Sequence, residues 1–163
     1  MATFVPTSSI IGVDLDNTST TQLFALGTHV LGSNNSEWVY VIIGPTAVTA
    51  YKMVAFTNAY TCAMASVADM QTNGLQLGVA QTAMATGAYG WVAIRGNSIG
   101  VLGSGSSTLV PQGVFLHGTG LVDNQASASG TLAGVAIASV AQTAGVTVTG
   151  MLLSWPRGYG VGM

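Results

Sequence analysis

Residues 36–43 have the sequence SEWVYVII, and this stretch decides the fold class. Successive side chains of a β-strand point to opposite faces of the sheet. The alternation therefore places three large side chains on each face, Trp38, Tyr40 and Ile42 on one and Val39, Val41 and Ile43 on the other. Because both faces are apolar, the stretch predicts a strand that is buried on both sides and ends at Gly44-Pro45.

Segments farther along the chain repeat this pattern of short apolar runs bounded by turn residues. Residues 47–57 predict a second strand whose alternation slips near Ala50, where a bend or bulge would restore it. Residues 58–71 fit a helix or a strand, and we interpret them as a strand followed by a loop. Further strands are expected at residues 75–81, 88–95, 99–102, 113–117, 120–123, 132–140 and 146–155, with turns at Asn73-Gly74 and Gly96-Asn97.

About ten short strands with frequent turn signals are typical of an all-β, single-domain sandwich or barrel. The first 27 residues are less regular and indicate an extended N-terminal arm that could cross to a neighbouring subunit. The end of the chain is rich in glycine and should need external contacts to be ordered. We therefore expect an arm over residues 1–27, a β domain over 28–155 and a C-terminal tail over 156–163.

The chain carries very few charged residues. Three Lys and Arg and five Asp and Glu make up 5% of its 163 residues, against about 25% in ordinary soluble domains. A nearly neutral surface has little electrostatic protection against association. We therefore expect protein partners to cover much of the exterior.

Composition also bears on which partners are expected. Binding to nucleic acid requires clustered Lys and Arg side chains, and the three present here are far apart, so we expect no nucleic-acid partner. A membrane-spanning helix needs about 20 mostly apolar residues in succession, and no stretch provides them, so we expect no membrane partner. The N-terminal residues lack the features of a signal peptide, which predicts synthesis in the cytoplasm.

Residues that could perform catalysis are few and fit no known motif. The serines have only His29 and His117 as potential bases, and we interpret both histidines as structural or surface residues. The loop Gly103-Ser-Gly-Ser-Ser lies between short strands and lacks the strand-turn-helix context of a hydrolase nucleophile. We therefore predict that the chain is not an enzyme and has no catalytic residue.

Metal and cofactor sites are not expected either. Cys62 is the only cysteine and is interpreted as a small buried thiol. Asp14 and Asp16 alternate as at the start of a calcium loop, but the glycine and the distal glutamate of that loop are missing. An Asx turn explains them better, although a weak cation site shared between subunits stays open. Glycine-rich phosphate-binding motifs are absent from the sequence.

Aromatic residues supply the candidate binding surface. Trp38 and Trp91 lie inside predicted strands and are expected in the core. Trp155 and Tyr159 lie near the glycine-rich end and are expected at an interface. The complete set of predicted interface residues is Trp155, Arg157, Tyr159, Phe4 and Phe24.

Two stretches, residues 26–41 (LGTHVLGSNNSEWVYV) and 78–96 (GVAQ through GAYGWVAIRG), carry a family resemblance. Together they resemble small tailed-phage virion proteins in which a Gly-Ser-Glu-Trp-Val-Tyr strand precedes a Tyr-Gly-Trp-Val strand. The second stretch is also similar to capsid cement proteins. The resemblance implies a decoration protein on the exterior of a bacteriophage capsid, in contact with the major capsid protein and with copies of itself, as a trimer or another local multimer.

Two alternatives stay open. The chain could be another virion component, such as a shell subunit of a small capsid or a tail, fibre or knob protein. It could also be a carbohydrate-binding β domain that uses exposed Trp and Tyr rings as stacking platforms. Copy number on the particle would distinguish the first alternative, and glycan binding by the isolated protein would favour the second.

Overall fold

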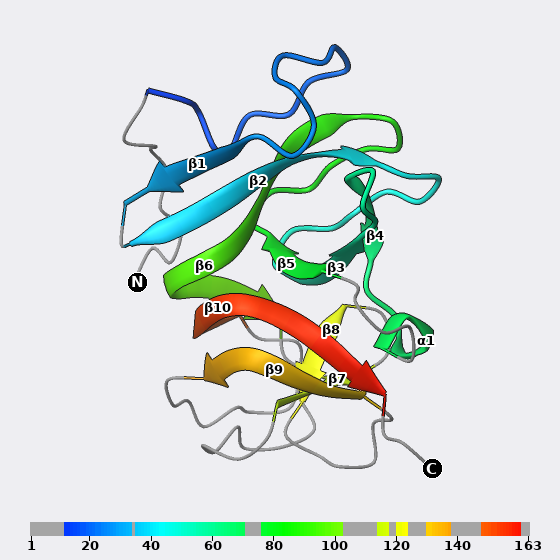
Figure 1. The fold of residues 1–163 in the computed structure, drawn as a ribbon, viewed down its shortest axis with the longest axis vertical. Helices are drawn as coiled ribbons and strands as arrows, with labels where there is room; N and C mark the ends of the chain where they lie inside the picture. The colour runs from blue at the N-terminus through cyan, green and yellow to red at the C-terminus, as the bar shows by residue number, and fades with distance from the viewer. Residues whose placement is uncertain are drawn as a thin grey trace.

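The computed structural model describes residues 12–33, 35–70, 76–102, 114–117, 120–123, 130–137 and 148–160. Apart from one helical turn, these residues form strands and connections, which confirms the predicted all-β class (Figure 1). In chain order the elements are β1 (His29–Gly32), β2 (Ser36–Ile43), β3 (Lys52–Phe56), β4 (Thr61–Met64), α1 (Val67–Met70), β5 (Gln76–Ala80), β6 (Tyr89–Leu102), β7 (Val114–His117), β8 (Leu121–Asp123), β9 (Gly130–Ile137) and β10 (Val148–Gly160).

Five of the strands close into a barrel. β2 pairs in parallel with β4 and in antiparallel fashion with β6. The antiparallel pairs β4–β3, β3–β5 and β5–β6 complete the ring. Closure gives each of these strands a partner on both sides, which is how small β proteins avoid exposed sheet edges. Of the two architectures that the sequence left open, the barrel is therefore the correct one for this part of the chain.

The other strands extend the sheet beyond the barrel. β1 pairs with the first half of β2. The long β6 continues past its contacts with β2 and pairs with β10, which in turn pairs with β9. β9 leads through β7 to β8, and Figure 1 shows these strands at one end of the barrel.

β2 is buried on both faces, as its sequence predicts, and its two faces belong to different hydrophobic clusters. Val39, Val41 and Ile43 lie in a cluster that receives side chains from all five barrel strands, so this cluster fills the barrel interior. Trp38 and Tyr40 lie in a cluster that also contains residues of β1, β8, β10 and the segment before β1. This second cluster therefore lies between the outer face of the barrel and the elements that cover it.

The small interior leaves no space for a side chain at residue 78. A Cβ atom there would lie 2.8 Å from the backbone oxygen of Ala93 and would also clash with the side chain of Val92. Glycine in β5 thus allows close approach to β6 where the barrel closes.

Two local predictions agree with the structure only in part. The slip near Ala50 corresponds to a turn in which Tyr51 has a φ of 61°, so β3 starts only at Lys52. Residues 58–71 contain the expected strand, β4, but α1 follows it in place of a plain loop. Ser66 stabilises this turn, because its N–H and its hydroxyl both donate to the Asp69 carboxylate, at 2.6 and 2.8 Å.

The predicted turn at Gly96-Asn97 is wrong. β6 runs without interruption from Tyr89 to Leu102, and Gly96 absorbs the bend with a φ of 142° that L side chains rarely adopt. The pairing registers with β2 and β10 both shift near this point. The glycine therefore marks a bend inside a strand shared by the barrel and the extension.

The two predicted terminal regions are described in part. Residues 12–27 pack against the barrel of their own chain, where Leu15 is 2% exposed. β10 continues to Gly160 in register with β9, so the expected start of the tail at residue 156 lies inside a strand. Residues 1–11 and 161–163, the Asn73-Gly74 turn and the serine-rich loop lie outside the described residues.

Candidate functional site

The predicted interface residue Trp155 lies on β10 at an irregularity of the strand. The register between β10 and β9 shifts between Leu153 and Arg157, and Trp155 has a φ of 44°, in the left-handed region. That region is strained for a bulky side chain. The Trp155 side chain is 50% exposed, whereas Leu153 and Pro156 are buried. The bulge therefore turns this indole outward, a common effect of bulges near binding sites.

A row of paired residues runs across three strands to Arg95, which contacts the indole. Leu31 in β1 pairs with Glu37 in β2, which pairs with Arg95 in β6. The Arg95 guanidinium carbon lies 5.0 Å from the centroid of the Trp155 ring, in a cation–π contact. The Nδ1 atom of His29 lies 2.8 Å from a carboxylate oxygen of Glu37. We call His29, Leu31, Glu37, Arg95 and Trp155 the Trp155 surface.

The Trp155 surface combines exposed apolar side chains with charged side chains that already have partners within the protein. Leu31 is 52% exposed and Trp155 50%, whereas Glu37 contacts His29 and Arg95 lies over the indole. A cavity of about 80 Å³ opens beside Trp155, between His29 and Gln76. These features suit contact with another protein, since aromatic and arginine side chains with satisfied charges are typical of interface centres.

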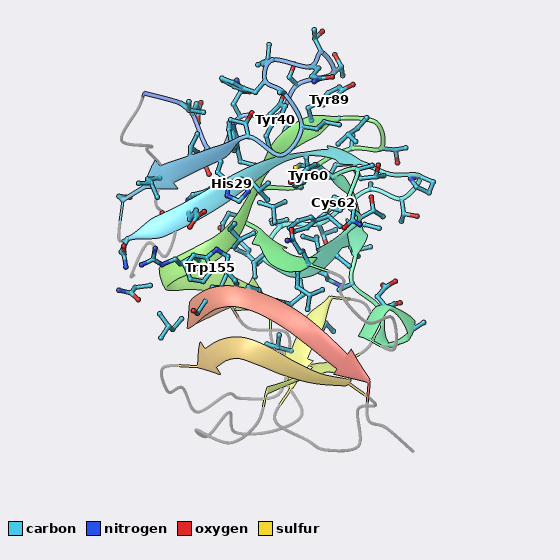
Figure 2. All side chains as sticks on the ribbon, in the orientation of Figure 1. His29, Tyr40, Tyr60, Cys62, Tyr89 and Trp155 are labelled. Carbon is cyan, nitrogen blue, oxygen red and sulfur yellow. The ribbon has the colours of Figure 1, made fainter. Side chains whose placement is uncertain are left out.

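Phe24 lies elsewhere, on the segment before β1. Its ring centroid lies 5.3 Å from that of Tyr40, edge to face, and 5.3 Å from that of Trp91. Figure 2 shows Tyr40 well separated from Trp155, so the structure does not bring Phe24 and Trp155 together. Arg157 and Tyr159 lie on β10, but their side chains are outside the described part, as is the whole of Phe4. The interface set as a whole remains a prediction.

The remaining aromatic and cysteine predictions concern the core. Trp38 is 0% exposed and Trp91 3%, which confirms both as core residues. Cys62 is also buried, and burial raises the pKa of its thiol to about 12. The thiolate is the reactive form, so burial disfavours reaction of this cysteine in the folded protein.

Several carboxylates serve local structure. An oxygen of Asp14 accepts a hydrogen bond from the N–H of Asp16 at 3.1 Å, which confirms the Asx-turn interpretation. Burial, followed by repulsion from Asp14, raises the pKa of Asp16, while a hydrogen bond from Thr82 opposes this shift. Asp69 is engaged by Ser66. In the described part of the chain, Asp14, Asp16 and Asp69 therefore each make a local contact.

The described residues contain neither a metal-binding cluster nor a membrane-spanning helix. No group of three or more His, Cys, Asp or Glu side chains in this part of the chain is arranged to hold a metal ion. Among the same residues, no helix has both the length and the apolar character needed to cross a membrane. His29 is an exposed residue paired with Glu37, and the side chain of His117 on β7 lies outside the described set.

No protein-family model matches the chain, and no significant match exists among curated proteins or solved structures. Function therefore has to be inferred from the chemistry of the chain itself.

Proposed function

We propose that this chain is a non-enzymatic structural protein of a virion, which decorates a bacteriophage capsid and stabilises it through contacts between subunits. The proposal rests on one observation. The accessible surface measures 7664 Å², but the chain has only eight charged residues, and large apolar side chains are exposed. Five of these exposed side chains are Leu23, Phe24, Leu31, Leu152 and Trp155. Such a surface favours burial against protein neighbours.

The energetic gain at each contact would be modest and would add up over many copies. Aromatic side chains bury roughly 150–250 Å² each, so covering the exposed half of Trp155 removes about 100 Å² from water. At about 25 cal/mol per Å² this corresponds to about 2–3 kcal/mol before the costs of association. Repeated over a capsid, contacts of this size would hold neighbouring capsomers together at their joints.

The partners proposed are the major capsid protein and further copies of the chain, assembled as a trimer or another local multimer on the capsid surface. Strand addition offers a second type of contact. β1 and β8 terminate the sheet formed by the described strands, and a terminal strand can pair with a strand of a neighbour. This contact needs no charged side chains.

The proposal includes the finer organisation of about ten strands expected from the sequence. Residues 12–27 pack on their own barrel and residues 156–160 belong to β10, so these parts are not proposed as an arm or a tail that reaches a neighbour. A shell subunit or a tail, fibre or knob protein would use the same surface chemistry. Copy number separates a role on the head from a tail, fibre or knob role, because a head protein is present in many copies distributed over the head.

Particles with and without the protein provide the test. Purified protein added to particles that lack it should bind and raise the temperature at which they release their genome. The Trp155→Gly variant should bind at least tenfold more weakly, because it removes the indole while glycine accepts the positive φ without strain. Its thermal unfolding should stay close to that of the parent protein.

Thr46→Ala is the control, since Thr46 is an exposed residue in the connection between β2 and β3, and this variant should bind normally. Equal heat resistance of particles with and without the protein would refute cementing. If the Trp155→Gly variant binds particles as well as the parent protein does, the Trp155 surface is not part of the interface with the capsid.

A further inference from the structure

A cavity of about 210 Å³ lies between residues 12–24 and the outer face of β2 and β6. Backbone hydrogen bonds hold the two walls together: Ser19 N–H donates to the Tyr89 oxygen at 3.0 Å, and Tyr89 N–H donates to the Ser19 oxygen at 2.7 Å. The N–H of Leu23 donates to the Tyr40 hydroxyl at 3.2 Å. Figure 2 shows Tyr40 and Tyr89 close together under this segment. The cavity is therefore built by one chain and does not require a partner.

One wall of the cavity is aromatic and fixed by packing. The Tyr40 and Trp91 ring centroids lie 4.9 Å apart, and both side chains are at most 3% exposed. The Tyr89 ring stacks on Tyr40 at 6.1 Å with an interplanar angle of 14°, and the Phe24 ring closes the group. The buried Tyr40 and Trp91 rings thus support Phe24, which is 36% exposed, and the partly exposed Tyr89. These two rings form the accessible apolar wall before any ligand arrives, which lowers the cost of binding.

The opposite wall carries polar groups of complementary types. The Asp14 carboxylate has about four acceptor positions, and the Asp16 N–H occupies one of them. The exposed Asn17 amide, which can both donate and accept, has no hydrogen-bond partner among the described residues. The Ser19 hydroxyl accepts from the N–H of Thr21 and can still donate. Acceptors and donors thus face an aromatic wall across a narrow space.

We propose that this cavity binds one uncharged pyranose ring of a glycan. A pyranose has an apolar C–H face that suits an aromatic wall, and its hydroxyl groups can donate to Asp14 and exchange hydrogen bonds with Asn17. The volume is below the roughly 300 Å³ at which pockets for drug-sized ligands begin, so it accommodates about one ring. This activity goes beyond the proposed structural role, since it would let the particle adhere to a glycan-coated surface.

Two other ligand classes fit the cavity less well. An anionic ligand would face the Asp14 carboxylate, and neither Lys nor Arg occurs among the described lining residues. A quaternary ammonium ion requires several free aromatic faces around one point. Here the rings of Phe24, Tyr40 and Trp91 pack against one another on one side of the cavity, so they form a single wall and not a cage.

Titration of the isotope-labelled full chain by NMR tests the proposal. The probes are the methyl pyranosides of glucose, galactose, mannose and N-acetylglucosamine. At least one should shift the signals of the Phe24 and Tyr89 rings with a dissociation constant in the millimolar range, as a single-ring contact implies. Asp14→Ala and Asn17→Ala should each weaken this binding at least tenfold, while Asn58→Ala, at an exposed asparagine on another loop, should leave it unchanged.

Amide spectra and melting temperatures of the variants establish that they fold. Absence of shifts with all four glycosides would overturn the proposal, as would glycoside binding that survives both cavity substitutions in folded protein. Shifts caused by tetramethylammonium and by none of the glycosides would assign a cation site instead. Attachment of Asp14→Ala to capsids should remain normal, so failure here is distinguishable from failure of the decoration role.

Discussion

Asp16 combines a partly buried carboxylate with a neighbouring charge of the same sign. Burial and repulsion from Asp14 raise its pKa above the ordinary 3.8, and one of its buried oxygens has no hydrogen-bond partner among the described atoms. The folded protein therefore holds the Asp16 proton more tightly than the unfolded chain does. It follows that this residue favours folding at low pH and that its contribution is lost as the pH rises from about 3.8 through the raised pKa.

Asp16→Asn should remove this dependence. We expect the variant to be more stable than the parent at pH 7, because an amide carries no charge to desolvate and can still accept the hydrogen bond from Thr82. The difference in unfolding free energy, measured with urea at several pH values, should shrink as the pH falls below 3.8. A variant that is less stable at pH 7 would mean that the charge of Asp16 has a partner the structure does not reveal.

At the scale of elements, alternation along the sequence predicted the strands with two buried faces. Val92 and Ile94 lie in the barrel interior, and Trp91 and Ala93 lie on its outer face, as the pattern of β6 indicates. Pairing between distant strands could not be predicted in this way. The parallel contact of Ile42 with Thr61 closes the barrel, and no local pattern encodes it.

The candidate sites were less predictable than the strands, because they also depend on contacts between segments that are distant in the sequence. The outward position of Trp155 agrees with its sequence context, but its contact with Arg95 depends on the β6–β10 register. The glycan cavity was missed because the polar composition of residues 14–22 indicated an arm. A single apolar residue, Leu15, is buried in the outer cluster and helps to hold this segment on the barrel. One side chain in a polar run is too weak a periodic signal to predict packing.

Closure of the barrel at Gly78 leads to a prediction for β5. Gly78→Ala should destabilise the protein by about 1–3 kcal/mol, because the new methyl group meets the Ala93 backbone, which cannot move without disturbing β6. Chemical denaturation of the two proteins would measure this difference. Gly44→Ala is the matched control, with the nearest backbone atom, the Cys62 oxygen, at 3.3 Å, and should cost less. Equal effects of the two substitutions would show that the β5–β6 contact is looser than the structure indicates.

At the scale of the whole molecule, the scarcity of charge predicts how the protein should associate in solution. Salt weakens contacts between ions, because it shortens the range of electrostatic forces to about 3 Å at 1 M. It does not weaken contacts between apolar surfaces. Self-association through exposed residues such as Leu31 and Trp155 should therefore persist when sodium chloride is raised from about 0.1 M to about 1 M.

A charge placed within the Trp155 surface should oppose this association. Leu31→Lys, at a residue 52% exposed on β1, should weaken self-association at least tenfold, about 1.4 kcal/mol, because contact would bury the new ammonium group. Thr46→Lys adds the same charge outside the Trp155 surface and should have a much smaller effect. Comparison of the two variants therefore separates the effect of the position of the charge from the effect of net charge. Sedimentation velocity over a concentration series measures both. A parent protein that remains monomeric at millimolar concentration would contradict the view that neighbours normally cover this neutral surface, and with it the physical basis for a capsid role.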